Sequence, residues 1–148
     1  MSIADNKKAY FDYAILEKFE AGLVLSGPEV KSVKRGEINL KGSYISLNGT
    51  TSAFLVKAYI APYKPATNYQ RSYDPYQNRQ LLLRRKELKH LFGRSSEPGL
   101  TIIPLNIFLK GGLIKITLGV AKGKKKFDKR ESIKKREFER RKKNLIDD

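Results

Sequence analysis

The sequence predicts a mainly β domain with short flanking helices, followed by a basic C-terminal tail. Three observations lead to this prediction: a long stretch alternates apolar and polar residues with period two, glycine-containing turns join further apolar runs, and cations crowd the end of the chain. The length of 148 residues suits one domain with a hydrophobic core and is short for two.

The first expected strand covers residues 11–25. Its odd positions, from Phe11 to Leu25, are apolar except for Glu17, a pattern typical of a half-buried strand. The length indicates a bent strand, and we expect the bend or bulge at Gly22.

A short helix should follow. Ser26 and Glu29 have the spacing of a capping box, and Pro28 suits a first helical turn. Gly36 would end the helix. The expected buried edge is Val30 and Val33, and the cations that point elsewhere are Lys31, Lys34 and Arg35.

Two strands, Ile38–Leu47 and Thr51–Ala61, are joined by Asn48-Gly49, a strong hairpin signal. Pro62 stops the second strand. Residues 62–79 form a loop whose length is typical of functional or mobile segments, and we assign it no role.

The second half of the body is expected to contain a helix at Gln80–Phe92, followed by Gly93. One face of it would carry Leu81, Leu82, Leu88 and Leu91. Two further strands, Leu100–Leu109 and Leu113–Val120, meet around Gly111-Gly112. The five strands, with a helix between the early and late ones, predict a small β-barrel of the OB type.

Charge divides the chain into two parts. The net charge is +16, and residues 121–148 hold 13 of the 31 basic and 6 of the 15 acidic residues. Such a surplus predicts a polyanionic partner, because it costs self-repulsion in the folded state. The apolar residues of this region are too sparse for a core, so we expect a body at 1–121 and a tail at 122–148, with the boundary near Gly123.

No catalytic constellation is visible. Cysteine is absent and His90 is the one histidine, which excludes disulfides and His/Cys metal clusters, and we expect no Ser-His-Asp arrangement. We place His90 on the partly exposed side of its helix. Gly111-Gly112 lacks the context of a phosphate-binding loop. We therefore expect a protein that is not an enzyme and that uses no cofactor or metal.

Targeting and membrane signals are also missing from the sequence. Residues 1–10 lack the apolar run of a secretory signal, and no stretch approaches the roughly 18 apolar residues of a membrane span. We expect a cytoplasmic monomer.

Two readings of the tail remain open. The run Lys122–Lys126 suits either a solvated linker or phosphate contact, with Gly123 allowing close approach of an RNA strand; its place after the last strand favours phosphate contact. Acid-first pairs four residues apart, such as Glu131/Lys135, support a helix only weakly. We expect a largely disordered tail that becomes helical on RNA; a membrane-surface helix is the competing reading, with a thin apolar face.

Glu29 also has two readings. Its carboxylate can pair with the start of the helix, or it can accept hydrogen bonds from base amino groups while Lys31, Lys34 and Arg35 hold phosphates. The pattern alone favours the first reading.

Several segments, in this order and spacing, closely resemble the SsrA-binding protein (small protein B) family: Asn6-Lys7-Lys8-Ala9, Asp12-Tyr13, Phe19-Glu20-Ala21-Gly22, Gly27-Pro28-Glu29-Val30-Lys31-Ser32, Ile60-Ala61-Pro62-Tyr63, Arg79-Gln80-Leu81-Leu82-Leu83, Thr101-Ile102-Ile103-Pro104-Leu105, Ala121-Lys122-Gly123-Lys124-Lys125 and Asp128-Lys129-Arg130. The resemblance covers essentially the whole chain and implies an OB-type barrel with a basic tail.

The resemblance also implies a function. Family members bind transfer-messenger RNA at its tRNA-like domain and carry it to stalled ribosomes, where the tagged peptide is marked for degradation. Alanyl-tRNA synthetase and elongation factor Tu act through the RNA. The protein itself would be a recognition and positioning factor.

By position, Asn6, Glu29, Leu91 and Lys124 match family residues implicated in binding the tRNA-like domain, and Leu91 would act mainly by packing its helix. The full expected RNA-binding set is Asn6, Lys7, Lys8, Glu29, Lys31, Lys34, Arg35, Leu91, Lys122, Gly123, Lys124 and Lys125.

The tail would serve the ribosome. Asp128, Lys129 and Arg130 match a motif needed for accommodation, and Ile133 and Lys134 begin the portion that enters the vacant decoding site and message channel, against small-subunit rRNA. Phe127 departs from the His or Tyr common in the family, which preserves stacking but removes a hydrogen bond from the ring.

Three other classes stay open on sequence grounds: a permanent ribosomal protein with its tail threaded through rRNA, a nuclease or RNA-modifying enzyme, and a membrane-associated basic protein.

Overall fold

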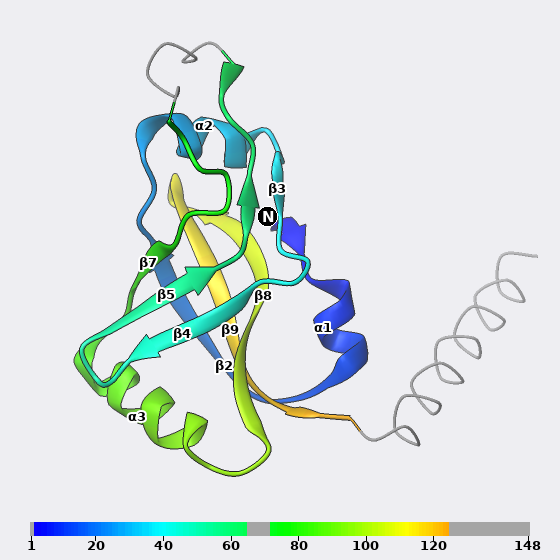
Figure 1. Cartoon of the computed structure of the whole chain (residues 1–148), viewed down its shortest axis with the longest axis vertical. Helices are drawn as coiled ribbons and strands as arrows, with labels where there is room; N and C mark the ends of the chain where they lie inside the picture. Colours follow the sequence, from blue (N-terminus) through cyan, green and yellow to red (C-terminus); the bar gives the residue numbers. More distant parts are fainter. Residues whose placement is uncertain (1, 65–71, 125–148) are drawn as a thin grey trace, which may run out of the picture.

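The computed structural model describes residues 2–64 and 72–124, and this part of the chain is mainly β (Figure 1). The strands are β1 (Ser2–Asp5), β2 (Tyr13–Leu23), β3 (Ile38–Asn39), β4 (Tyr44–Asn48), β5 (Ser52–Val56), β6 (Tyr59–Ile60), β7 (Arg79–Leu82), β8 (Leu100–Lys110) and β9 (Leu113–Gly123). The helices are α1 (Lys7–Asp12), α2 (Gly27–Lys34) and α3 (Arg85–Ser95).

Seven strands form one antiparallel sheet in the order β1-β8-β9-β2-β7-β5-β4, and β3 pairs with β6 separately. The sheet is strongly curved, so that β4 lies against β8, but hydrogen bonds do not close it into a cylinder. The mainly β prediction is confirmed, with an open sheet where a closed barrel was expected.

The first predicted strand exists in a shortened form. Phe11 belongs to α1, and β2 ends at Leu23. The prediction of the bulge at Gly22 was wrong, because the register between β2 and β9 shifts between Ile15 and Glu17. Gly22 instead pairs regularly with neighbours on both sides of β2, and an added Cβ would come within 3.2 Å of the Leu82 Cβ.

Two predicted strands are each broken in two. The chain leaves the extended conformation between β3 and β4, and again between β5 and β6, where Lys57 has a φ of 62°. The hairpin between β4 and β5 is confirmed, with Tyr44 opposite Val56 and Asn48 opposite Ser52.

The prediction of a helix at Gln80–Phe92 was wrong for the first part of this segment and correct for the second. Its first part is β7, which lies between β2 and β5 in the sheet. Arg79 and Leu81 are buried whereas Gln80 and Leu82 are exposed, which is the period-two alternation of a strand. The helix α3 begins at Arg85, and Gly93 lies inside it.

The last two predicted strands are confirmed as β8 and β9. They turn through Gly111 and Gly112, whose φ angles of 59° and 78° suit a tight hairpin turn. β9 continues to Gly123, so Lys122 and Gly123 belong to the sheet although the sequence placed them in the tail.

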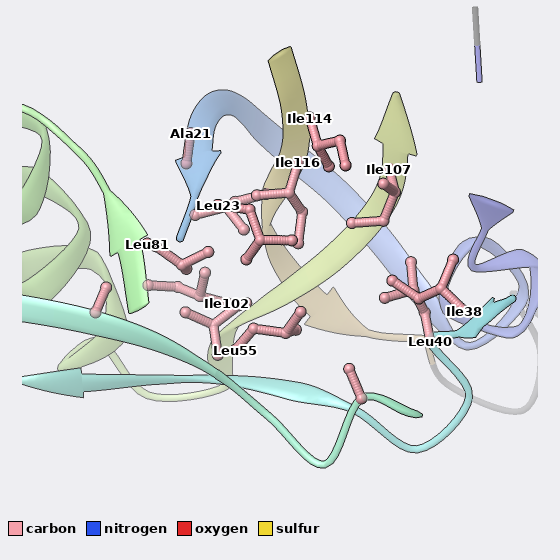
Figure 2. Close-up of a cluster of buried hydrophobic side chains, with 14 of the residues drawn as sticks. Ala21, Leu23, Ile38, Leu40, Leu55, Leu81, Ile102, Ile107, Ile114 and Ile116 are labelled. Carbon is pink, nitrogen blue, oxygen red and sulfur yellow. The ribbon is translucent and has the colours of Figure 1, made fainter. Parts of the chain in front are cut away.

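The main core fills the inner face of the curved sheet (Figure 2). Leu55, Leu81, Ile102, Ile107 and Ile116 meet there from four strands, all nearly inaccessible. α3 packs against this core through two leucines, Leu88 and Leu91. A second, smaller cluster of Ala9, Ile103, Leu105 and Ala121 holds α1 against β8 and β9.

Candidate nucleic-acid interface

Asn6 fixes the start of α1. Its side-chain oxygen accepts a hydrogen bond from the Ala9 N–H at 3.4 Å, and its Nδ2 donates to the Pro104 carbonyl at 2.9 Å. Its backbone N–H donates to the Leu105 carbonyl at 2.8 Å. Since both ends of the amide are bonded within the protein, Asn6 orients α1 and exposes Lys7 and Lys8, the first two residues of the helix.

The end of β9 lies against the other end of α1. The Lys124 backbone N–H donates to the Asp12 carbonyl at 2.9 Å, and its Nζ donates to the Tyr10 carbonyl at 3.2 Å. Lys122, two residues earlier and within β9, is exposed. We call the cations on and beside this helix the α1 surface: Lys7, Lys8, Lys122 and Lys124.

A hollow of about 300 Å³ adjoins the α1 surface. Asn6 and Lys8 line one side of it, and Tyr44 and Thr101 are among the residues on the other. It therefore offers cationic, aromatic and hydroxyl groups together, which is a suitable environment for a nucleotide.

A second cationic surface lies on α2. Lys31, Lys34 and Arg35 are all exposed. The Lys31 Nζ and the Arg35 Cζ lie 5.5 Å and 5.7 Å from the centre of the Tyr63 ring. Tyr63 thus holds two cations one helical turn apart, and we call this group of four residues the α2 surface.

Glu29 lies beneath the α2 surface and is 2% exposed. Its Oε1 accepts a hydrogen bond from the Ser26 N–H at 3.0 Å, and the Ser26 hydroxyl accepts one from the Glu29 N–H at 3.3 Å, which confirms the capping box. Its Oε2 lies 2.7 Å from Arg79 Nη2 in a buried ion pair.

Further donors complete this buried cluster. The Tyr73 hydroxyl and Gln77 Nε2 both donate to Glu29 Oε2 at 3.1 Å. Arg79 also donates to the Ala58 carbonyl at 2.7 Å and to the Tyr73 oxygen at 2.9 Å. With both carboxylate oxygens bonded internally, the direct base contact considered for Glu29 does not fit this structure, and the helix-capping reading does.

These contacts shift two pKa values. Burial alone would raise the pKa of Glu29, but hydrogen bonds from Ser26, Gln77 and Arg79 outweigh it and hold the pKa below its usual value. Burial, aided by the Glu29 charge, raises the pKa of Tyr73 to about 12 although Arg79 opposes it. The carboxylate therefore stays charged and the phenol stays a donor at neutral pH.

Leu91 is completely buried in the main core. It cannot touch RNA from this position, and its packing fixes α3, as expected from the sequence.

The structure does not bring the expected RNA-binding residues into one patch. α2 lies at one end of the long axis, whereas α1 and the end of β9 lie together along one side (Figure 1). The remaining expected site residues lie outside the described part of the chain: Lys125, Phe127, Asp128, Lys129, Arg130, Ile133 and Lys134.

Sequence reasoning missed four residues, which are Tyr63 of the α2 surface and the Glu29 partners Tyr73, Gln77 and Arg79. All four lie in the loop to which no role was assigned, or at its end. The available signal was the clustering of Tyr and Arg there, but their partners on α2 lie far away in the sequence.

His90 is on the partly exposed side of α3, as predicted. Its Nε2 lies 2.9 Å from Glu17 Oε2, and 47% of its side chain is exposed. Within residues 2–64 and 72–124, no three His, Cys, Asp or Glu side chains are grouped as metal ligands would be. Nor does any helix in that part of the chain have the length and apolarity to cross a membrane.

Comparison with known proteins gives one consistent result. The family described as SmpB protein matches residues 3–148. An SsrA-binding protein of Persephonella marina is 49% identical over 93% of this chain and 89% of its own length. An SsrA-binding protein of Cupriavidus taiwanensis is 43% identical over 99% of this chain and 97% of its own length.

The fold has a solved counterpart. A chain described under "tmRNA-SmpB: a journey to the center of the bacterial ribosome" superposes with a TM-score of 0.65 at 38% identity, covering 88% of this chain and 93% of that one. The open curved sheet is consistent with the OB-type fold expected from the sequence. On these grounds the chain belongs to the SmpB protein family.

Proposed function

We propose that this protein is an RNA-binding factor of trans-translation: its body binds the tRNA-like domain of transfer-messenger RNA, and the pair acts on stalled ribosomes. The observation that carries the proposal is the similarity, along nearly the whole chain, to proteins named SsrA-binding protein. The solved relative, described with tmRNA and the ribosome, supports the same partners.

The cationic surfaces supply the binding chemistry. Lys and Arg side chains on the α1 and α2 surfaces neutralise RNA phosphates and release counterions, which makes affinity depend on salt. Asn6 and Glu29 act indirectly, because one orients α1 and the other anchors α2. The hollow beside α1 would receive a nucleotide of the RNA.

In this proposal the body and the tail have different roles. The tail, 125–148 with Phe127, Asp128, Lys129, Arg130, Ile133 and Lys134, would occupy the vacant decoding site and message channel against small-subunit rRNA. Elongation factor Tu and alanyl-tRNA synthetase would meet the protein only through the RNA. The protein would act in the cytoplasm by positioning, with no bond chemistry of its own.

The test is a binding comparison with purified full-length protein. We expect preference for the tRNA-like domain over a duplex of equal length, with a log–log salt slope of about −0.7 to −0.9 per phosphate contact. Equal affinity for the two RNAs would overturn the proposal. Co-purification with non-stalled ribosomes after a high-salt wash would instead favour a permanent ribosomal protein.

A further inference from the structure

The densest group of cations in the described part of the chain lies at the start of α3. Arg84, Arg85, Lys86 and Lys89 are all exposed, and we call them the α3 cation cluster. None of them forms an ion pair with a described residue. The nearest acid in the sequence, Glu87, accepts a hydrogen bond from the Arg84 backbone N–H at 3.0 Å and so caps the helix.

Cations near this cluster, unlike its members, form ion pairs with acidic side chains. Arg94, later on α3, pairs with Glu97 at 2.9 Å. Lys110 and Lys115 lie 3.2 Å and 3.7 Å from Glu20. The cations at the start of α3 therefore lack the acidic partners that these neighbouring cations have, and this contrast identifies a surface suited to an external anion.

A hollow of about 440 Å³ lies beside the cluster. Arg85 and Lys89, one turn apart on α3, line it on one side, and Thr50 and Thr51 of the β4–β5 turn line it on the other. The Thr51 hydroxyl donates to the Asn48 carbonyl at 2.7 Å, whereas the exposed Thr50 hydroxyl bonds to no described residue.

The remaining lining is apolar. Leu83 and Leu88 form it, and Leu88 is buried. A guanidinium, an ammonium and a free hydroxyl thus surround an apolar floor, which matches a phosphodiester with its ribose. A simple small-molecule site would be more enclosed and mostly apolar.

We propose that this hollow is a binding site for the phosphodiester backbone of RNA, separate from the α1 and α2 surfaces. Arg85 and Lys89 would bind one phosphate, Thr50 would donate to it, and the two leucines would contact the sugar. α3 lies at the opposite end of the long axis from α2, so the site would engage a different stretch of RNA (Figure 1). The inference rests on the proposed function, because it assumes an RNA partner.

The experiment compares two full-length double variants that lose the same charge. R85Q/K89Q removes both cations of the proposed site, and K110Q/K115Q removes two cations that share Glu20 as their ion-pair partner. Affinity is measured over a salt series in two arms, one with the tRNA-like domain of transfer-messenger RNA and one with protein-free ribosomal RNA. Thermal unfolding of each variant confirms that the fold is kept.

We expect R85Q/K89Q to weaken binding about tenfold in one arm, with a salt slope shallower by about 0.7–0.9 for the lost phosphate contact. The control should stay within about twofold. The RNA whose affinity falls is the one that supplies the phosphodiester backbone bound at this site. Thr50→Val should weaken binding of the same RNA by a smaller factor. It should leave the salt slope unchanged, since no charge is removed.

Equal effects of the two double variants in both arms, or no effect of R85Q/K89Q in either, would overturn this site while leaving the proposed function intact. If the unmodified protein showed no preference for the tRNA-like domain, the proposed function would fail, and this inference with it.

Discussion

The two carboxylate oxygens of Glu29 accept hydrogen bonds from different parts of the chain. One accepts from the N–H of Ser26, the N-cap of α2, and the other accepts from Tyr73, Gln77 and Arg79. The first contact could be predicted, because a capping box is local and has a fixed spacing. The second could not, since its donors lie 44 to 50 residues away and the pairing depends on the tertiary fold.

Removing the partner of this buried carboxylate should be costly. We expect Arg79→Met to lower the free energy of unfolding by about 3–5 kcal/mol at neutral pH, because Glu29 is left buried and charged without its cation. Without Arg79 the pKa of Glu29 should rise, because burial still raises it and the hydrogen bond and charge of Arg79 no longer lower it.

The loss of stability in Arg79→Met should depend on pH in a defined direction. In the native protein the lowered pKa contributes stability above pH 4.5, and that contribution is lost as the pH falls through the folded-state value. In the variant, protonation relieves the buried charge, so its deficit should shrink as the pH falls. Denaturant unfolding across pH measures this, with exposed Arg85→Met as the matched control; a deficit that does not change with pH would contradict the role given to Glu29.

At the scale of elements, hairpins could be predicted and an isolated short strand could not. The β4–β5 and β8–β9 turns carry local Gly signals that fix two adjacent strands. β7 has no hairpin partner adjacent in the sequence, and its leucines also fit a helix that continues into α3. Its strand conformation comes from hydrogen bonds with β2 and β5, which only the assembled sheet provides.

The β8–β9 turn allows a direct test of this local control. Gly112 has a φ of +78°, a region that L side chains avoid, so Gly112→Ala should cost about 1–2 kcal/mol. Gly27→Ala is the control, because Gly27 lies at the start of α2 without a positive φ and an added Cβ meets nothing within 4 Å. Thermal or denaturant unfolding measures both; equal losses would show that turn conformation does not limit the stability of this hairpin.

At the scale of the whole molecule, charge and family resemblance predicted an RNA-binding body, but the boundary of that body depends on strand pairing. Lys122 and Gly123 pair with Ala14 and Tyr13, and Lys124 bonds to the Asp12 carbonyl. A run of cations looked like the start of a tail, yet its first residues complete the sheet, because backbone hydrogen bonds do not depend on side-chain charge.

Truncation at two neighbouring positions should separate these roles. A chain ending at Lys124 keeps every pair of β9 and should retain its thermal stability and most of its affinity for the tRNA-like domain, while losing peptide tagging on stalled ribosomes. A chain ending at Ala121 also loses the last two pairs between β9 and β2, Gly123 with Tyr13 and Lys122 with Ala14, and should unfold at a lower temperature. Intact tagging by the Lys124 truncation would contradict the role proposed for the tail.

The sheet order has a consequence for biosynthesis. Among the strands of the described residues β9 is the last to be translated, yet it lies between β8 and β2, and α1 depends on the bond from Asn6 to Pro104, 98 residues away. A nascent chain therefore cannot assemble this sheet until residues up to Gly123 have left the exit tunnel. Such high contact order makes folding slow and cooperative, so synthesis that breaks off before β9 yields no partly active body.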